Sequence, residues 1–261
     1  MAYPPAPLTD LSLVMQRHNK TGAGSENALE LTFASYNIHK AIGLDRRRDP
    51  ERIIAVLREL DADVIALQES DRRFGERVAT LPRVLLDDTP WRVAPVARRR
   101  RSIGWHGNAM LVRRGITIKE AERIALPGLE PRGAVRVDLH KDGHDFRAVG
   151  THLDLSGMRR RAQIKTILAH CAGRTPEQPS VIMGDFNQWS QRRGAIRSFG
   201  ENWRVLRTEP SYPSRRPIAR LDRIVASTQW ECTEWATHHS AMAVQASDHL
   251  PIYARMLLPK I

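Results

Sequence analysis

The chain has 261 residues, of which 41% are hydrophobic and 27% are charged, so it can bury a substantial core and disorder throughout is excluded. Forty-one basic residues against 29 acidic residues give a formal net charge of +12. No apolar run approaches the roughly 18 residues of a membrane-spanning helix, and the first residues lack the pattern of a signal peptide, which predicts a cytoplasmic protein without an integral membrane segment.

The N-terminal residues 1–30 are rich in proline, glycine and small polar residues. This composition predicts a flexible tail with at most a short helical stretch over 8–15. From residue 31 onward, strand-like and helix-like segments follow one another at short intervals. We therefore predict a single domain over residues 31–261.

The domain begins with a strand, helix, strand pattern. Residues 31–38 are typical of a strand, and Asp49 followed by Pro50 is typical of the N-cap and first position of a helix. The apolar residues of this helix recur at helical spacing and predict a face that packs on a sheet: Ile53, Ile54, Leu57 and Leu60. Residues 63–70 form a short apolar run that predicts a buried central strand.

The middle of the domain is typical of successive strands connected as hairpins, over 109–114, 116–126, 134–141 and 145–154. Arg114-Gly115 and Asp142-Gly143 supply turn signals between them.

The C-terminal part combines one more helix with buried strands. The helix is predicted over 157–171, and the strands over 179–187, 220–227, 230–238 and 247–257. Buried strands that alternate with helices at both ends, with antiparallel strands between them, predict an α/β protein with two stacked sheets and helices outside.

Polar residues cluster near the ends of these predicted strands. Such groups are costly beside a core unless they form hydrogen bonds or bind a cation. A capped strand end or a turn explains any one of them alone, whereas the whole set predicts a functional cluster. Its members are Asn37, Glu69, His152, Asp185, Asn187, Asp222, Asp248 and His249.

Six short motifs in a fixed order carry a resemblance to a known family: YNIH (36–39), LQES (67–70), GTHLDL (150–155), GDFN (184–187), RLDRI (220–224) and SDHLP (247–251). On these motifs the chain resembles the endonuclease/exonuclease/phosphatase superfamily of divalent-metal phosphohydrolases. The resemblance spans nearly the whole chain and implies a four-layered α/β/β/α sandwich with two stacked mixed sheets and helices outside.

The resemblance also implies a metal site. Glu69 is expected to be the principal ligand, with Asn37 and Asp248 close to the same ion. Mg²⁺ suits such a site, with Mn²⁺ as a substitute, because it is a hard ion held by one or two carboxylates that takes the substrate phosphate as a further ligand.

The same resemblance implies catalytic residues around the phosphate. His249 is expected to lie at the phosphate, positioned by Asp222, and to act either as a base or as a charged stabiliser. Asp185 is expected to orient or deprotonate the attacking water. Asn187 and His152 are expected to donate hydrogen bonds to phosphoryl oxygens.

Asn108 and Arg132 resemble positions on the substrate-phosphate side in bacterial members of the family. A turn amide and a surface guanidinium explain these two residues equally well.

The excess of positive charge is almost entirely arginine, because only six of the 41 basic residues are lysine. Guanidinium groups suit bidentate contact with phosphate, so this surface predicts nucleic acid as a partner, or an anionic membrane surface. A GC-rich genome would produce the same excess. Two clusters are candidates for phosphate contact, although exposed solvated arginines explain them as well: Arg98 to Arg101 and Arg159 to Arg161.

The sequence indicates the type of reaction more directly than it indicates the substrate. His39 stands where abasic-site endonucleases have an acidic or amide residue, and Tyr212 is the only aromatic residue in the loop 209–219. A wedge for a flipped abasic sugar is therefore poorly supported. We favour an endo- or exonuclease that uses a metal-positioned water. The alternatives are a phosphatase or phosphodiesterase for a lipid head group or small phosphoester, and a non-catalytic nucleic-acid-binding protein.

Overall fold

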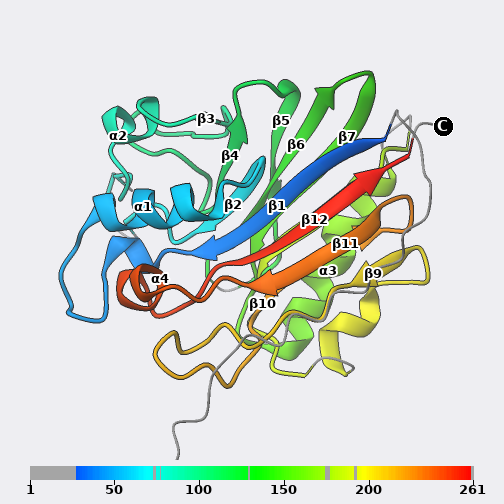
Figure 1. Ribbon diagram of the computed structural model, residues 1–261. Coiled ribbons are helices and arrows are strands. Elements are labelled where there is room, and N and C mark those ends of the chain that lie inside the picture. Colours follow the sequence, from blue (N-terminus) through cyan, green and yellow to red (C-terminus); the bar gives the residue numbers. More distant parts are fainter. Residues whose placement is uncertain are drawn as a thin grey trace, which may run out of the picture.

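Two stacked β-sheets form the centre of the protein (Figure 1). The computed structural model describes residues 28–72, 75–76, 78–128, 130–173, 177–190 and 193–259. The tail predicted over 1–30 lies outside these residues except for its last three positions, and the short helix predicted over 8–15 lies outside them entirely.

The first sheet is mixed and has six strands. Their order is β11 (Glu231–Thr237), β12 (Ile252–Leu258), β1 (Leu29–Asn37), β2 (Val64–Gln68), β4 (Ala109–Arg113) and β3 (Trp91–Val93). β1 and β2 are parallel, with Asn37 opposite Gln68, and the other pairs are antiparallel. The carboxyl ends of β1 and β2 therefore lie side by side.

The second sheet repeats this arrangement with one central parallel pair. Its order is β5 (Thr117–Ala125), β6 (Gly133–Lys141), β7 (His144–His152), β8 (Ser180–Asp185), β10 (Asp222–Ser227) and β9 (Trp203–Val205). β7 and β8 are parallel and place His152 opposite Asp185, while the other pairs are antiparallel.

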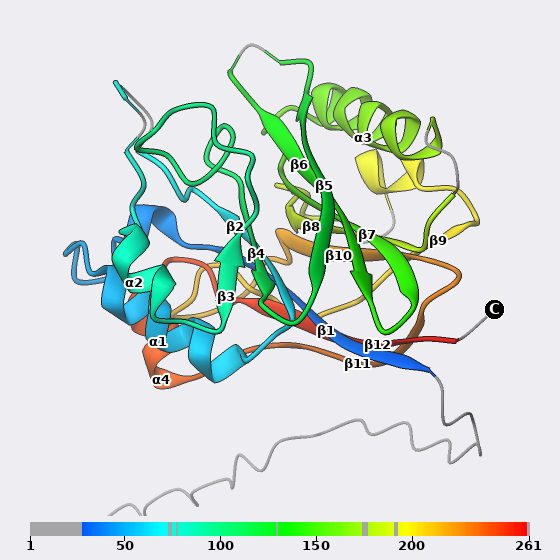
Figure 2. The same cartoon turned by 90° about the horizontal axis from the view of Figure 1, so that it is seen from above.

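Helices cover the outer faces of both sheets (Figure 2). On the first sheet lie α1 (Pro50–Leu60), α2 (Arg83–Asp87), α4 (Ala241–Ala246) and the short 3₁₀ helix η1 (His39–Ala41). On the second sheet lie α3 (Gly157–Ala172) and the 3₁₀ helix η2 (Gly194–Ser198). The predicted four-layered sandwich is confirmed. None of the helices in the described part of the chain is both long and apolar enough to cross a membrane.

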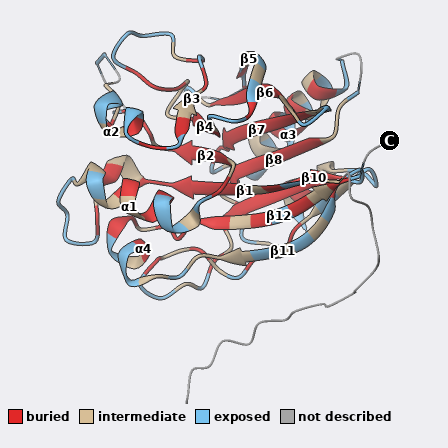
Figure 3. Ribbon diagram, turned by 45° about the horizontal axis from the view of Figure 1, so that its top comes forward, coloured by how far each residue is buried: buried red, intermediate tan, exposed pale blue. Residues whose placement is uncertain are grey.

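Strand periodicity creates this layering, because alternate side chains of a strand point to opposite faces. On β1, Leu31 and Phe33 pack between the sheets, whereas Ala34 and Tyr36 pack against the helices. Both faces of the central strands are buried (Figure 3). The predicted helix start is also confirmed, since the Asp49 side chain accepts hydrogen bonds from the backbone N–H groups of Glu51 and Arg52 and Pro50 follows it.

The connection at Arg114-Gly115 differs from the prediction. Asp142-Gly143 does join a hairpin, β6 to β7, but Arg114-Gly115 links β4 to β5, which belong to different sheets. β4 already pairs with β2 on one side and β3 on the other, so no edge remains for β5. Ile116 enters the core between the sheets, and the chain crosses over there.

Gly184 allows β8 to approach β7 just before Asp185. Its φ is +156°, and a Cβ at this position would lie 1.8 Å from the backbone oxygen of Thr151. Backbone cannot move aside as a flexible side chain can, so only glycine fits this close approach. The pairing of Asp185 with His152 depends on it.

We expect Gly184→Ala to lower the free energy of unfolding by about 2 kcal/mol or more, because the added methyl group collides with buried backbone. Chemical denaturation of the purified variant measures this loss. Gly200→Ala is the matched control, because a Cβ at Gly200 meets nothing within 4 Å. Equal stability of the two variants would contradict the packing argument.

Candidate active site

Polar residues from both sheets meet at one edge of the sandwich. Asn37 ends β1 and Glu69 follows β2, both in the first sheet, while His152 ends β7 and Asp185 ends β8 in the second. The Asn37 side-chain amide donates to Asp185 Oδ2 over 3.1 Å and so bridges the two sheets. The predicted convergence of strand ends is present in the structure.

Asp185 lies at the centre of this cluster and is almost completely buried. Besides the bond from Asn37, its Oδ1 accepts from the backbone N–H of Asn187 over 2.9 Å. Its Oδ2 lies 3.4 Å from His152 Nε2 and 3.8 Å from His249 Nε2. Burial acts to raise the pKa of Asp185, but the two imidazoles and the hydrogen bonds outweigh burial and lower that pKa. Asp185 is therefore an ionised carboxylate at neutral pH.

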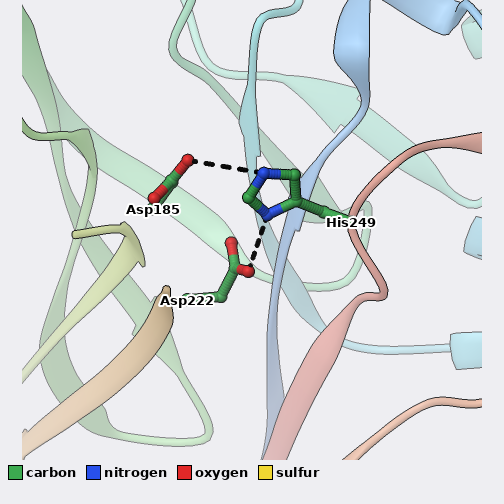
Figure 4. A group of neighbouring side chains, drawn as sticks. All are labelled: Asp185, Asp222 and His249. Atoms are coloured by element: carbon green, nitrogen blue, oxygen red, sulfur yellow. Dashed lines mark hydrogen bonds and ion pairs between the residues drawn. The ribbon is translucent and has the colours of Figure 1, made fainter. Parts of the chain in front are cut away.

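His249 lies between two carboxylates (Figure 4). Its Nδ1 is 2.9 Å from Asp222 Oδ2, and Nε2 faces Asp185. Asp222 also accepts a hydrogen bond from Ser211 Oγ over 2.5 Å, and the ring of Tyr212 packs 4.8 Å from the imidazole. Burial acts to lower the pKa of His249, but the charge and hydrogen bond of Asp222 and the charge of Asp185 raise it to about 10. This imidazole therefore carries a positive charge at neutral pH.

The pKa of His152 is shifted in the opposite direction. Burial lowers its pKa, and the positive charge of Arg132 lowers it further, although Asp185 opposes both effects. The Asn187 side-chain amide donates to the backbone oxygen of Leu153 over 2.9 Å, which ties the residue after His152 to the loop after β8. The pKa values of the two imidazoles are therefore shifted in opposite directions, that of His249 toward the charged form and that of His152 toward the neutral form.

Glu69, Asn37 and Asp248 present oxygen atoms around the end of β1. Ile38 N donates to Gln68 O over 3.1 Å, so Glu69 follows directly beside the end of β1. Asp248 Oδ1 lies 3.8 Å from His39 Nδ1, and Ser247 Oγ donates to Asn37 O over 2.7 Å. Two carboxylates and an amide oxygen are ligands that Mg²⁺ prefers. The Lys40 ammonium contacts Glu69, so a positive charge already lies against this carboxylate. The residues therefore fit a divalent cation.

Asp185, Asp222 and His249 form a second group with metal-ligand chemistry, because their ligand atoms lie within 4.8 Å of one another. His249 faces a carboxylate with each ring nitrogen, and its raised pKa means that both nitrogens carry protons. A doubly protonated imidazole has no lone pair for a metal. In this geometry the group is better suited to stabilising charge than to binding an ion.

The two residues expected near the substrate phosphate differ in their surroundings. Asn108 is buried and its amide donates to the backbone oxygen of Gly133 over 3.0 Å, as a structural amide does. Arg132 is 3.3 Å from Glu130 and close enough to His152 to affect its pKa. Arg132 therefore lies near His152, and Asn108 supports the backbone.

The arginine clusters partly contact nearby backbone and acids. Arg160 donates to the backbone oxygens of Asp154 and Leu155, and Arg159 lies 3.7 Å from Asp154 Oδ2. Arg101 pairs with the exposed Glu76 at 3.0 Å. The cluster of Arg159 to Arg161 therefore adjoins the loop after His152.

Three further residues at the site were not singled out from the sequence. Lys40 contacts Glu69, Ser211 donates to Asp222, and Ser247 holds the end of β1. Lys40 directly follows the YNIH motif and Ser247 lies inside SDHLP, so their positions offered a signal. Ser211 lies in a loop without a motif, and only the fold brings it to Asp222.

We expect Asp222→Asn to lower the pKa of His249 from about 10, because the imidazolium loses its nearest negative charge. The raised pKa stabilises the folded wild type fully below about 6.5, the ordinary histidine pKa, and this contribution is lost as pH rises toward 10. The difference in unfolding free energy between wild type and variant should therefore be largest at acidic pH and narrow toward pH 10.

NMR titration of the His249 ring and denaturation at several pH values, both with chelator present, measure these effects. Asp145→Asn, next to His140 instead, is the control. An unchanged His249 titration in Asp222→Asn would contradict the charge assignment.

Known proteins resemble this chain along most of its length. The sequence profile of the Endonuclease/Exonuclease/phosphatase family matches residues 34–249. The uncharacterized protein YbhP of Escherichia coli K12 is 29% identical over 247 residues, covering 85% of this chain and 94% of that protein. An endonuclease/exonuclease/phosphatase from Bacteroides vulgatus has a similar fold, with a TM-score of 0.71, 17% identity, and coverage of 88% of this chain and 99% of that one. D. rerio TDP2, solved with a single-strand DNA product, has a TM-score of 0.68 and 15% identity, covering 87% and 98% respectively.

Proposed function

Because the chain belongs to the Endonuclease/Exonuclease/phosphatase family, a family of phosphoester hydrolases, we propose that it hydrolyses phosphodiester bonds of nucleic acid with the help of a divalent metal ion. The observation that carries the proposal is the meeting of Asp185 with Asn37, His152 and His249 at one edge of the two sheets. An anionic carboxylate beside a positively charged imidazole and hydrogen-bond donors can orient a water molecule toward a phosphoryl group.

The protein side chains divide the chemistry among them. Asp185 orients the attacking water, because its carboxylate is fixed by Asn37 and the backbone of Asn187. His249, held by Asp222, offers a protonated nitrogen to the phosphoryl oxygens and stabilises the charge that develops there. His152 faces the same Asp185 oxygen as His249 does, and Asn187 follows Asp185 closely, so we assign to His152 and the Asn187 side chain hydrogen bonds to the remaining oxygens.

Glu69, Asn37 and Asp248 would hold the metal ion. A divalent ion bound there polarises the phosphoryl oxygen and offsets negative charge in the transition state. Lys40 neutralises the Glu69 carboxylate in its absence, since the ammonium group contacts Glu69 directly. Burial acts to raise the pKa of Glu69, but the hydrogen bond and charge of Lys40 outweigh burial and lower it.

Two surface features support nucleic acid as the substrate. Trp189 follows Asn187 by two residues and is 63% exposed, which offers an aromatic face on which a base can stack. The net charge of +12 favours attraction of a polyanion. The similarity to D. rerio TDP2 with bound single-strand DNA product is consistent with this substrate class.

A lipid head group is the second candidate. Leu155 and Met158 follow His152 in the chain and are largely exposed, and Arg159 to Arg161 adjoin them. Apolar side chains next to arginines suit the surface of an anionic membrane. Hydrolysis of lipid phosphoesters without cleavage of DNA or RNA would select this candidate.

We expect the wild type with Mg²⁺ or Mn²⁺ to cleave single-stranded DNA or RNA, and His249→Ala to lower kcat by about 10²- to 10⁴-fold while the fold is retained. The panel includes an oligonucleotide, plasmid, bis-nitrophenyl phosphate and a phospholipid, each with metal and with chelator. His140→Ala, a more exposed histidine beside Asp145, is the matched control.

Equal cleavage rates of wild type and His249→Ala would contradict the assignment of the active site.

The affinity for nucleic acid should fall steeply as the salt concentration rises, because phosphate contacts release counterions.

We expect Glu69→Gln to weaken Mg²⁺ or Mn²⁺ binding by about 10-fold or more, because the variant loses the charged ligand. Lys40→Met should strengthen binding, because the ion no longer competes with an ammonium group for Glu69. Isothermal titration with the metal alone measures both constants. Glu59→Gln is the control, since that carboxylate binds His238 and Ser240 instead. Unchanged metal affinity in Glu69→Gln would place the ion elsewhere.

A further inference from the structure

Three arginine side chains are almost completely buried in the described part of the chain, and they differ in their hydrogen-bond partners. Arg147 pairs with Asp138 at 2.7 Å, and Arg136 pairs with Glu120 at 2.5 Å. Arg223, which is 2% exposed, donates instead to two backbone oxygens, those of Asp222 and Gln188, over 3.1 and 3.0 Å.

Among the described residues no carboxylate pairs with the Arg223 guanidinium. A buried charge is costly unless it is paired.

Arg223 points away from the catalytic cluster. Along β10, Ile224 and Ala226 pack between the sheets, whereas Val225 packs on the outer face under α3 and η2. Since alternate residues share a face, Arg223 lies on the outer side with Val225, and Asp222 lies on the inner side with Ile224. The site of Arg223 is therefore separate from that of His249.

A cavity of about 120 Å³ adjoins Arg223 on this outer side. Its lining consists of three arginines and three aliphatic residues: Arg207, Arg220, Arg223, Ile196, Val205 and Leu206. The lining includes no carboxylate. Glu209, a largely exposed residue, lies 3.5 Å from Arg220, which also donates to the backbone oxygen of Thr208.

The physical chemistry of this cavity favours an anion. Three arginines line one small space, the positive charge of Arg220 already acts against that of Arg223, and aliphatic walls lower the local dielectric and strengthen any charge interaction. Burial and the charge of Arg220 lower the pKa of Arg223 to about 10, although the charges of Asp222 and Asp185 act to raise it. The volume is several times the roughly 10–15 Å³ that one water needs, so a tetrahedral oxyanion of five heavy atoms fits.

We propose that this arginine pocket, formed by Arg207, Arg220 and Arg223, binds a phosphate group at a second site distinct from the catalytic edge. The planar guanidinium fork matches the oxygen geometry of phosphate. The phosphate belongs either to free inorganic phosphate or to the backbone of a polynucleotide that extends beyond the catalytic site. The proposal goes beyond the hydrolytic function and does not depend on it.

The test measures binding of inorganic phosphate to the full chain by isothermal titration, with chelator and without sulfate. Arg207→Gln combined with Arg220→Gln removes two of the pocket charges without altering the buried Arg223. Arg58→Gln is the matched control, since Arg58 is an exposed arginine that pairs with Asp88 and lies in α1, which covers the first sheet. His249→Ala tests the catalytic edge separately.

We expect the wild type and Arg58→Gln to bind phosphate alike, and phosphate binding at the pocket to persist in His249→Ala even if binding at the catalytic edge is lost. The double pocket variant should bind phosphate at the pocket about 10-fold more weakly or not at all. Circular dichroism confirms that the variants are folded. Phosphate binding that is lost in His249→Ala and retained in the double variant would overturn the proposal, as would no binding by the wild type. Neither result would affect the proposed hydrolytic function, which the cleavage assays of wild type and His249→Ala test separately.

A second arm distinguishes the two sources of phosphate. If the polynucleotide backbone is the ligand, affinity for a single-stranded 12-mer should fall more in the double variant than in Arg58→Gln. If free phosphate is the ligand, the two variants should bind the 12-mer equally, while saturating phosphate raises the thermal midpoint of the wild type and not of the double variant.

Discussion

The hydrogen bond from Asn37 to Asp185 joins the two sheets at the edge where the candidate site lies. Each sheet has one central parallel pair whose carboxyl ends reach this edge, β1 with β2 and β7 with β8. The core between the sheets is apolar, so the sheets stack without a strong preference for the position of polar groups at their ends. Asn37 and Asp185 fix that position, and Asn187, His152 and His249 are arranged around the same carboxylate.

Charge balance at this edge is local and specific. His249 has a buried carboxylate on each side, and the half-buried Glu69 has the Lys40 ammonium, so opposite charges are paired at this edge. A low local dielectric makes each of these pairs strong and makes an unpaired charge costly. Arg223 differs from Arg136 and Arg147, because among the residues that the structure describes its guanidinium forms no ion pair with a carboxylate and donates to backbone oxygens instead.

Left-handed backbone conformations occur at the ends of three strands that carry the site, β1, β2 and β8. His39, Lys40 and Ala41 follow β1 with φ of 44°, 56° and 59°, and Glu69 and Asn187 have φ of 56° and 50°. The left-handed region is unfavourable for residues other than glycine. The surrounding sheets pay this cost, because it turns the chain sharply and presents polar side chains to the edge instead of continuing the strands.

From the amino-acid sequence alone one can predict the succession of the long strands along the chain, the start of α1, the layered architecture and the eight polar residues near strand ends. These features follow from local rules of periodicity, capping and polarity. The tertiary structure alone decided that β4 and β5 separate into different sheets, that Ser211 reaches Asp222, and that Lys40 contacts Glu69. Such contacts join residues far apart in the chain or depend on which sheet edges are already occupied. Neither a spacing nor a composition encodes the distance between two strand ends, because packing of the whole core sets it.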